Sequence, residues 1–347
     1  MGNINTSIVG FGLSGRYFFA PFIEYNSSFT LHSFVTSQEK EVYNEYSQAV
    51  VYGSVDEALN NDDIHLIVVA SPNYTHFDYA RKALLSGKHV VMEKPFTVTT
   101  EEAEQLIKLA NDRNLVLAPF QNRRWDGDFL TIEDMNNAKA LGEIVYFESH
   151  FDRYRPQYDR VEWKNEQLPG NGILYDLGPH LIDQALCLFG MPKEIFADIG
   201  ILRTNGKVDD FFDIQLYYNE LKVVLKAGVM VREQGPRFIV HGRTGSFIKY
   251  GLDPQEMNLR QGMKPENDKL GADHESYYGL IHTEKDGNIV REKVETVRGD
   301  YKKYFQNVAN AINGTEQLIV SPVDGKKIIH IIEKAYESNR LRKVIDI

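Results

Sequence analysis

The sequence predicts an α/β protein with a doubly wound parallel sheet in its first third and a C-terminal α+β domain that contains a large, mostly antiparallel sheet. Up to about residue 120, short apolar runs alternate with helical patterns, an order that produces parallel strands joined by crossover helices. Beyond it, long alternating segments follow one another with short turns, which is typical of antiparallel strands. At 347 residues the chain is long enough for two domains. We expect them at 1–120 and 121–347.

Five strands are expected in the first domain. The run at 64–70 is nearly continuous in apolar residues, as expected for a strand that is covered on both faces. The expected strands lie at 4–9, 29–36, 64–70, 89–92 and 115–119.

Helix boundaries in this domain are indicated by capping residues. Ser54 with Glu57, and Thr99 with Glu102, have the spacing of a capping box. The second pair begins a helix that should run to about residue 111. Gly87 is expected to end the helix that contains residues 80–85.

In the second domain, strands are expected at 143–151, 195–203, 212–218, 221–231, 237–241 and 246–250. Helices are expected at 128–140, 176–189, 301–312 and 323–339. The segment 253–293 is rich in Gly, Asp, Glu, Lys and Asn. We expect it to be a long excursion.

Composition excludes several classes of protein. The chain is 42% hydrophobic and 25% charged, which does not fit a disordered or fibrous protein. Its net charge of −10 argues against a nucleic-acid partner, because phosphate binding needs a basic face. No stretch approaches the roughly 20 apolar residues that span a bilayer, and the first residues lack a signal-peptide pattern. A single cysteine, Cys187, fits a reducing cytoplasm, and we expect it to be a small core residue.

A glycine-rich turn follows the first strand and opens a helix. It consists of Gly10, Phe11, Gly12, Leu13, Ser14 and Gly15. Gly10 would allow the tight turn, Gly12 the close approach of a pyrophosphate, and Gly15 the close packing of helix and strand. The amides at the helix N-terminus would bind the phosphates. This context predicts a Rossmann domain that binds NAD or NADP; the alternative is a turn kept for packing.

The end of the second strand bears on the choice of cofactor. An acidic residue there holds the ribose hydroxyls of NAD and repels the 2′-phosphate of NADP. Here the strand ends in Thr36 and Ser37, whose hydroxyls can donate to a phosphate, followed by Gln38. Lys40 or Arg16 would supply charge, whereas the nearby Glu39 is itself a candidate for the missing acid. We therefore favour NADP and keep NAD possible.

Polar residues follow the next two strands, where an open α/β sheet binds its ligands. Ser71, Pro72, Asn73 and His76 follow the run at 64–70 and are expected to line the cofactor; the alternative is a proline turn with a helix N-cap. Glu93 and Lys94 follow the run at 89–92 and are also expected to bind the cofactor. A lysine at the end of a buried strand needs a partner for its charge or a path to solvent.

The expected helix at 176–189 begins with two groups of complementary chemistry. Asp176 and His180 are four residues apart, so one helical face presents both. An imidazole beside a carboxylate is a suitable general base near neutral pH. Asp183 adds a carboxylate on roughly the same side. Taken alone, such a pair is more often a surface or capping pair.

These motifs together resemble the Gfo/Idh/MocA family of oxidoreductases. The resemblance covers essentially the whole chain and rests on the turn at 10–15, on Ser71–His76, on Glu93-Lys94-Pro95 and on the segment 172–183. It implies that Lys94 reaches the nicotinamide and the substrate oxygen. At finer grain, the segments 122–126, 153–156, 175–183 and 246–251 resemble those of bacterial NADP-dependent scyllo-inositol dehydrogenases. That group often has His where this chain has Phe19, and Arg where it has Gln38.

The resemblance implies a dehydrogenase that oxidises a secondary alcohol on a polyol or sugar ring, with scyllo-inositol as the leading substrate. Lys94, Asp176 and His180 would be catalytic and would contact the substrate, at a cleft between the domains. Asn122 would help to bind the cofactor. Trp125, Tyr154 and Arg155, with Arg153, are candidates for binding the ring. Their alternative role is interdomain structure. No metal is expected, because the histidines lack zinc-ligand spacing.

Two alternatives remain open, namely an oxidoreductase for another aldose or keto-sugar and a non-catalytic NAD(P)-binding regulator. A regulator has no need of the acid–base residues. The resemblance also implies a homo-oligomer. Long strands with helices on one face would leave the other face for a dimer to bury, and a tetramer is possible.

Overall fold

The computed structural model describes residues 3–158, 162–285 and 287–347. The chain divides into two compact units. One contains residues 1–122, 255–270 and 300–329, and the other contains 123–254, 271–299 and 330–347. Two later segments therefore belong with the first unit, whereas the division expected from the sequence at residue 120 was contiguous.

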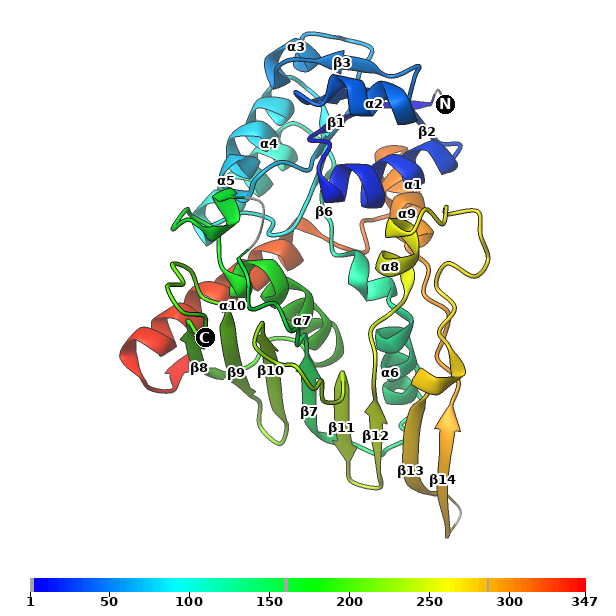
Figure 1. Cartoon of the computed structure of the whole chain (residues 1–347), viewed down its shortest axis with the longest axis vertical. Coiled ribbons are helices and arrows are strands. Elements are labelled where there is room, and N and C mark those ends of the chain that lie inside the picture. The colour runs from blue at the N-terminus through cyan, green and yellow to red at the C-terminus, as the bar shows by residue number, and fades with distance from the viewer. Residues whose placement is uncertain (1–2, 159–161, 286) are drawn as a thin grey trace. The chain divides into compact units, whose positions relative to one another are not determined.

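The first unit contains a six-stranded parallel sheet with the order β3-β2-β1-β4-β5-β6. Of its strands, β1, β2, β3 and β6 are labelled in Figure 1. Its strands are β1 (Ile4–Val9), β2 (Phe29–Val35), β3 (Val50–Tyr52), β4 (Leu66–Val69), β5 (His89–Met92) and β6 (Leu117–Pro119). All four residues of β4 are buried. The doubly wound sheet predicted from the sequence is confirmed; the short strand β3 was not predicted.

The helices of this unit begin and end largely where the capping residues indicate. They are η1 (Gly15–Phe19), α1 (Ala20–Tyr25), α2 (Glu39–Glu45), α3 (Val55–Leu59), η2 (Asn73–Thr75), α4 (His76–Leu85), α5 (Thr100–Asp112), α8 (Gln255–Arg260) and α9 (Lys302–Ile312). Thr99 and Glu102 form a complete capping box at α5. At α3, Ser54 accepts from the Glu57 amide, but the Glu57 carboxylate accepts from the Gly53 amide. Gly87 follows α4 with a φ of +74°.

An aromatic cluster explains why α9 belongs with the first unit although it lies far along the chain. The Phe22 ring of α1 stacks on Phe305 of α9 with centroids 5.0 Å apart. Phe120, just after β6, packs against Phe19 and Tyr304 at 4.3 and 4.9 Å. Burial of such large rings contributes strongly to stability, so these contacts fix α1 and α9 beside the end of β6.

The second unit contains a nine-stranded sheet with the order β14-β13-β12-β11-β7-β10-β9-β8-β15. Its strands are β7 (Ile144–His150), β8 (Glu194–Gly200), β9 (Phe211–Tyr217), β10 (Lys222–Gly228), β11 (Phe238–Gly242), β12 (Gly245–Lys249), β13 (Gly279–Lys285), β14 (Asn288–Val294) and β15 (Ile345–Asp346). All neighbours pair antiparallel except β7 and β10, which pair parallel. The mostly antiparallel sheet is therefore confirmed.

The segment 253–293, expected as a long excursion, contains regular structure that the sequence did not predict. This segment contains α8 and the hairpin β13–β14 at one edge of the sheet. Nearly every residue of β14 is exposed or half-buried, with no alternation of buried and exposed positions. Periodicity cannot identify a strand that buries neither face.

Helices α6 (Gly127–Asn137) and α7 (Ile173–Phe189), with the end of α10 (Pro322–Leu341), complete this unit, together with short turns η3 (Asn122–Trp125), η4 (Glu162–Asn165) and η5 (Glu275–Tyr277). The sheet residues Phe212, Ile214, Val223 and Leu225 are fully buried, and α7 packs on β9 and β10. Cys187, near the end of α7, is exposed, so the prediction of a core cysteine was wrong.

Candidate active site

The glycine turn after β1 has the geometry that its three glycines suggest. Gly10 has a φ of +106°, and a Cβ there would lie 2.5 Å from the Ala70 carbonyl oxygen. A Cβ on Gly15 would clash with the Gly10 carbonyl oxygen. A Cβ on Gly12 would meet no atom within 4 Å. The turn is therefore closed behind Gly10 and Gly15 and open in front of Gly12, which suits a dinucleotide pyrophosphate.

The side chains of this turn differ in their surroundings. Phe11 is buried, with its ring 5.0 Å from that of Phe34 on β2, so any cofactor contact from Phe11 comes from its backbone. Leu13 is exposed. Ser14 donates to the Glu93 carboxylate at 2.8 Å. This bond brings together two of the predicted cofactor-binding residues, one from each of two loops.

The end of β2 carries hydroxyl groups and no acid at positions 36–38. The Gln38 amide donates to Thr36 Oγ1 at 3.1 Å, and Ser37 is exposed. Arg16 donates from Nε to Glu45 at 2.9 Å, and the hydrogen bond to Glu45 is the main cause of a raised Arg16 pKa. Because Arg16 remains charged and half-exposed, it is able to exchange Glu45 for another anion.

The turn after β4 is closed by hydrogen bonds among its own residues. Ser71 and Thr75 hydroxyls lie 2.6 Å apart, and Thr75 Oγ1 donates to the Pro72 carbonyl at 2.7 Å. Ser71, Pro72 and Asn73 are half-buried. His76 is buried, and each ring nitrogen lies beside a backbone carbonyl oxygen, of Pro95 and of Ser71. Lys94 is half-buried at the end of β5.

Helix α7 begins three residues earlier than expected, which places Asp176 in its first turn. The start is capped from outside the helix. Asp209 accepts from the Leu174 amide at 2.9 Å and from the Tyr336 hydroxyl at 2.8 Å. Burial raises the Asp209 pKa against these bonds. Sequence reasoning missed Asp209, because a cap 35 residues away leaves no local signal.

The face of α7 that carries Asp176 also carries His180, which is 5% exposed and lies near the Phe151 ring. One turn further on, Asp183 is bound by Arg124. Arg124 Nε and Nη2 donate to the two carboxylate oxygens at 2.9 and 2.7 Å. Both oxygens of Asp183 are thus engaged by a bidentate guanidinium, a strong and geometrically specific pair.

The candidate ring-binding residues lie on two segments of the second unit. Trp125 is in η3 and is 7% exposed. Tyr154 is exposed, and the Arg232 guanidinium lies 3.9 Å from its ring centre. The Arg155 side chain is exposed, while its amide donates to the Val229 carbonyl at 2.7 Å. Trp125 therefore has a fixed, buried setting, whereas Tyr154 and Arg155 stand at the surface.

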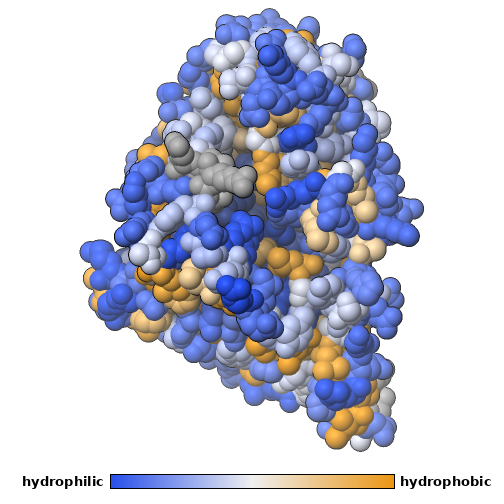
Figure 2. Space-filling model, viewed as in Figure 1, coloured by the Kyte–Doolittle hydropathy of each residue, from blue (hydrophilic) through white to orange (hydrophobic). Residues whose placement is uncertain are grey.

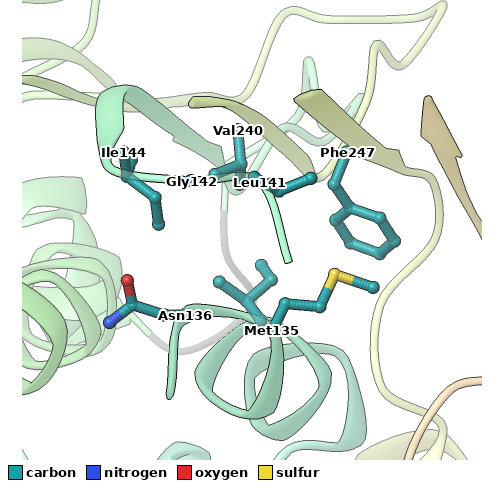
Figure 3. A pocket seen from close by; sticks show the side chains of 8 residues that line it. Met135, Asn136, Leu141, Gly142, Ile144, Val240 and Phe247 are labelled. Atoms are coloured by element: carbon teal, nitrogen blue, oxygen red, sulfur yellow. The ribbon is translucent and has the colours of Figure 1, made fainter. Parts of the chain in front are cut away.

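A pocket in the second unit lies apart from these residues. It is lined by α6, β7, β11, β12 and the loop before β7, and nearly all the side chains around it are apolar (Figure 3). Ile132, Met135 and Phe247 line it, with Asn136 the one polar side chain. It lacks the convergent polar groups of a binding site, so we regard it as a gap in core packing. Within the described residues, no group of His, Cys, Asp and Glu is arranged to hold a metal ion, and no helix is long and apolar enough to cross a membrane.

Comparison with protein families identifies both parts of the chain. Residues 4–120 match the NAD-binding Rossmann fold of an oxidoreductase family, and residues 137–347 match the C-terminal alpha/beta domain of the same family. The chain belongs to the Gfo/Idh/MocA oxidoreductase family. The family and fold class predicted from the sequence are thereby confirmed, and the glycine turn of this Gfo/Idh/MocA member is part of an NAD-binding domain.

Relatives of this family member extend over its whole length. The scyllo-inositol 2-dehydrogenase (NADP(+)) IolW of Bacillus subtilis (strain 168) is 38% identical over 99% of this chain and 95% of the relative. The oxidoreductase YdgJ of Escherichia coli, for which no substrate is named, is 38% identical over 99% and 98%. The solved structure of yvaA from Bacillus subtilis has a TM-score of 0.97 at 37% identity, covering 100% of this chain and 99% of that one.

Proposed function

We propose that this chain is a dehydrogenase that uses NADP to interconvert a secondary alcohol and a ketone on a polyol or sugar ring, with scyllo-inositol as the first candidate. The observation that carries the proposal is the placement of Asp176 and His180, four residues apart on α7, in a chain that is 38% identical to an NADP-dependent scyllo-inositol dehydrogenase. A polyol class also fits the candidate ring-binding residues, because aromatic and guanidinium groups bind hydroxyl-rich rings.

In the proposed reaction, His180 accepts the proton of the substrate hydroxyl as that O–H bond breaks. Asp176 orients the imidazole and stabilises the resulting cation. Lys94 donates a hydrogen bond to the reacting oxygen and holds the charge that develops as the carbonyl forms. The bound dinucleotide supplies the acceptor for the hydride that leaves the carbon. In the reverse direction His180 returns the proton to the oxygen, and the hydride returns to the carbonyl carbon.

The preference for NADP rests on the end of β2. Thr36, Ser37 and Gln38 present no carboxylate that would repel a 2′-phosphate. Arg16 is a charged group within the same unit and donates to Glu45 at 2.9 Å. A phosphate would have to compete with Glu45 for it, so we propose a moderate preference for NADP in which NAD is still accepted.

The remaining site assignments are part of this proposal. The amides and side chains of the 10–15 turn, of Thr36 and Ser37, and of Ser71–Asn73 would hold the dinucleotide, with Asn122 and Glu93. Trp125, Tyr154 and Arg155 would contact the ring. A cytoplasmic location and a homodimer or homotetramer stay predictions, and the oligomeric state is measurable by light scattering of the purified chain.

The function is tested by a screen of initial rates in both directions. The purified chain is given NADP or NAD with inositols, glucose and related sugars, and the reduced cofactors with the corresponding ketones. We expect the highest kcat/KM with scyllo-inositol and NADP. Turnover confined to another sugar would make that sugar the substrate in place of scyllo-inositol. Tight NADP binding without turnover of any compound would favour a non-catalytic regulator.

The role of Lys94 is tested by Lys94→Ala. We expect kcat to fall by at least about 100-fold, because a charge-stabilising donor at the reacting oxygen is lost. The matched control is Lys82→Ala on α4, whose ammonium is exposed and pairs with Asp56, and its kcat should stay at the wild-type value. Undiminished turnover of Lys94→Ala on its best polyol would contradict the mechanism.

A further inference from the structure

His76 was expected to line the cofactor, but its side chain is buried, and the proposed chemistry gives this titratable residue no role. It is the first residue of α4 and is 1% exposed. Its Nδ1 lies 2.8 Å from the Pro95 carbonyl oxygen, and its Nε2 lies 3.0 Å from the Ser71 carbonyl oxygen. Both nitrogens therefore face backbone atoms. Among the contacts of the described residues, His76 is the one side chain of α4 that contacts both of these loops.

The two carbonyls belong to the loops that carry the candidate site. Ser71 begins the turn after β4 that continues into Pro72 and Asn73, the residues proposed to line the dinucleotide. Pro95 directly follows Lys94, the residue proposed to bind the reacting oxygen. A carbonyl fixed by a hydrogen bond restricts the backbone dihedrals on either side of it. The imidazole thus restrains the backbone of both loops from behind.

The proton on this ring decides how strong each restraint is. Carbonyl oxygens only accept, and a neutral imidazole has one N–H to donate. Burial lowers the His76 pKa, the two carbonyl contacts oppose that effect, and the nearby Lys94 charge lowers it further. The neutral ring therefore donates fully to one carbonyl at a time, so the two loops share a single donor.

We propose that His76 is a positioning residue that holds Lys94 through the Pro95 carbonyl and the dinucleotide-lining turn through the Ser71 carbonyl. It acts through these two loops and touches neither the substrate nor the cofactor. The inference rests on the proposed function for the role of Lys94, but its geometric part is testable without turnover.

Two substitutions separate the two contacts. The amide nitrogen of asparagine takes nearly the position of Nδ1, and that of glutamine nearly the position of Nε2. His76→Asn therefore keeps a donor for the Pro95 carbonyl and loses the contact with Ser71, whereas His76→Gln does the reverse. With His76→Asn we expect an unchanged kcat and a Kd for NADP raised about 10-fold, the effect of one hydrogen bond. With His76→Gln we expect an unchanged Kd and a kcat lowered about 100-fold by misplacement of Lys94.

Two measurements make the outcome independent of finding a substrate. NADP binding is measured by calorimetry, and the rate at which Lys94 is acylated by an amine-reactive ester is measured by mass spectrometry. We expect faster acylation of Lys94 in His76→Gln only. The control is His89→Gln, at the start of β5, where the ring nitrogen accepts from the Val116 amide; it should change neither quantity.

Each result decides the matter. Split effects on Kd and Lys94 reactivity, with no turnover of any polyol by the wild type, would support the positioning role and overturn the proposed function. Equal changes in both quantities for both variants, no change in either, or loss of folding in both variants by circular dichroism would overturn the positioning role, because each variant keeps one of the two bonds.

Discussion

At the residue scale, the three glycines of the cofactor turn are required for different reasons. Gly10 has a backbone conformation that side chains rarely adopt, and Gly15 lies against the Gly10 carbonyl. Gly12 is exposed and faces open space. The fold depends on the first two, whereas the third matters only when a ligand approaches.

This difference gives a prediction for Gly12→Ala. The variant should fold with wild-type stability, because its Cβ meets no protein atom within 4 Å. Its Kd for NADP should rise by at least about 10-fold, since the new methyl group stands where the pyrophosphate is expected. Calorimetry and thermal unfolding measure the two quantities.

The matched variant is Gly15→Ala, whose Cβ clashes with the Gly10 carbonyl oxygen. We expect it to lower the melting temperature, because backbone atoms must move to admit the methyl group. A wild-type Kd in Gly12→Ala would show that the dinucleotide does not approach this part of the turn.

At the element scale, α7 is held at both ends of its candidate catalytic face. Asp209 caps the start, and Asp183 binds Arg124 of η3. The adjacent Gln184 donates to the Arg123 carbonyl and accepts from Arg237, both at 3.0 Å. These contacts join η3, which contains Trp125, to the helix that contains His180. Asp183 was expected to add a carboxylate to the acid–base group. In the structure it binds Arg124 and so helps to hold the helix that contains that group.

Two substitutions on this helix should therefore affect different properties, one the stability of the protein and the other its turnover. Asp183→Asn removes the charge that pairs with Arg124, where the Asp183 side chain is 3% exposed and that of Arg124 is 13% exposed. Breaking a buried ion pair from one side should lower the free energy of unfolding by about 3 kcal/mol. Asp176→Asn should leave stability nearly unchanged and lower kcat by at least about 100-fold.

Urea unfolding and initial rates measure both variants. If Asp183→Asn were as stable as the wild type and equally impaired in turnover as Asp176→Asn, Asp183 would belong to the chemistry and the supporting role would be wrong.

At the scale of the whole molecule, charge and hydropathy are those of an ordinary acidic folded protein. The viewed face is mostly hydrophilic, with hydrophobic residues in scattered groups (Figure 2), as is usual for folded proteins. The net charge is −10. Within this acidic chain, the second unit contains a compact set of opposite charges around His150 on β7.

The stability of the chain should depend on pH through His150. Its ring nitrogens lie 2.7 and 2.9 Å from carboxylate oxygens of Glu148 and Asp152. Burial opposes the charge, but these carboxylates outweigh it and raise the His150 pKa. The stabilisation is complete below the unfolded value of about 6.5 and is lost as pH rises through the raised folded pKa.

Urea unfolding of the wild type and of His150→Gln at pH 6 and pH 9 measures this contribution. The stability difference between the two proteins should be larger at pH 6. His282→Gln, which replaces an exposed histidine on β13 of the same sheet, serves as the matched control for the exchange of histidine for glutamine. A larger difference at pH 9 for His150→Gln would contradict the assignment.

Much of this protein was predictable from sequence alone. The parallel strands, the capping box at Thr99 and the glycine turn follow from patterns within a few residues, and the motifs around Lys94 and His180 predicted the family. These predictions succeed because the spacing of apolar residues, helix capping and the close approach of backbone at glycines are properties of neighbouring residues.

Only the tertiary structure decided the features that depend on residues far apart in the chain. Asp209 caps α7 from 35 residues away, and Arg124 binds Asp183 from 59 residues away. Strand β14 of the edge hairpin has no buried residue, and Cys187 is exposed. Which partner satisfies a buried polar group is fixed by packing in three dimensions, and sequence spacing does not encode that choice. The sequence therefore determined the chemical groups of the candidate site, and the fold decided which of them support the others.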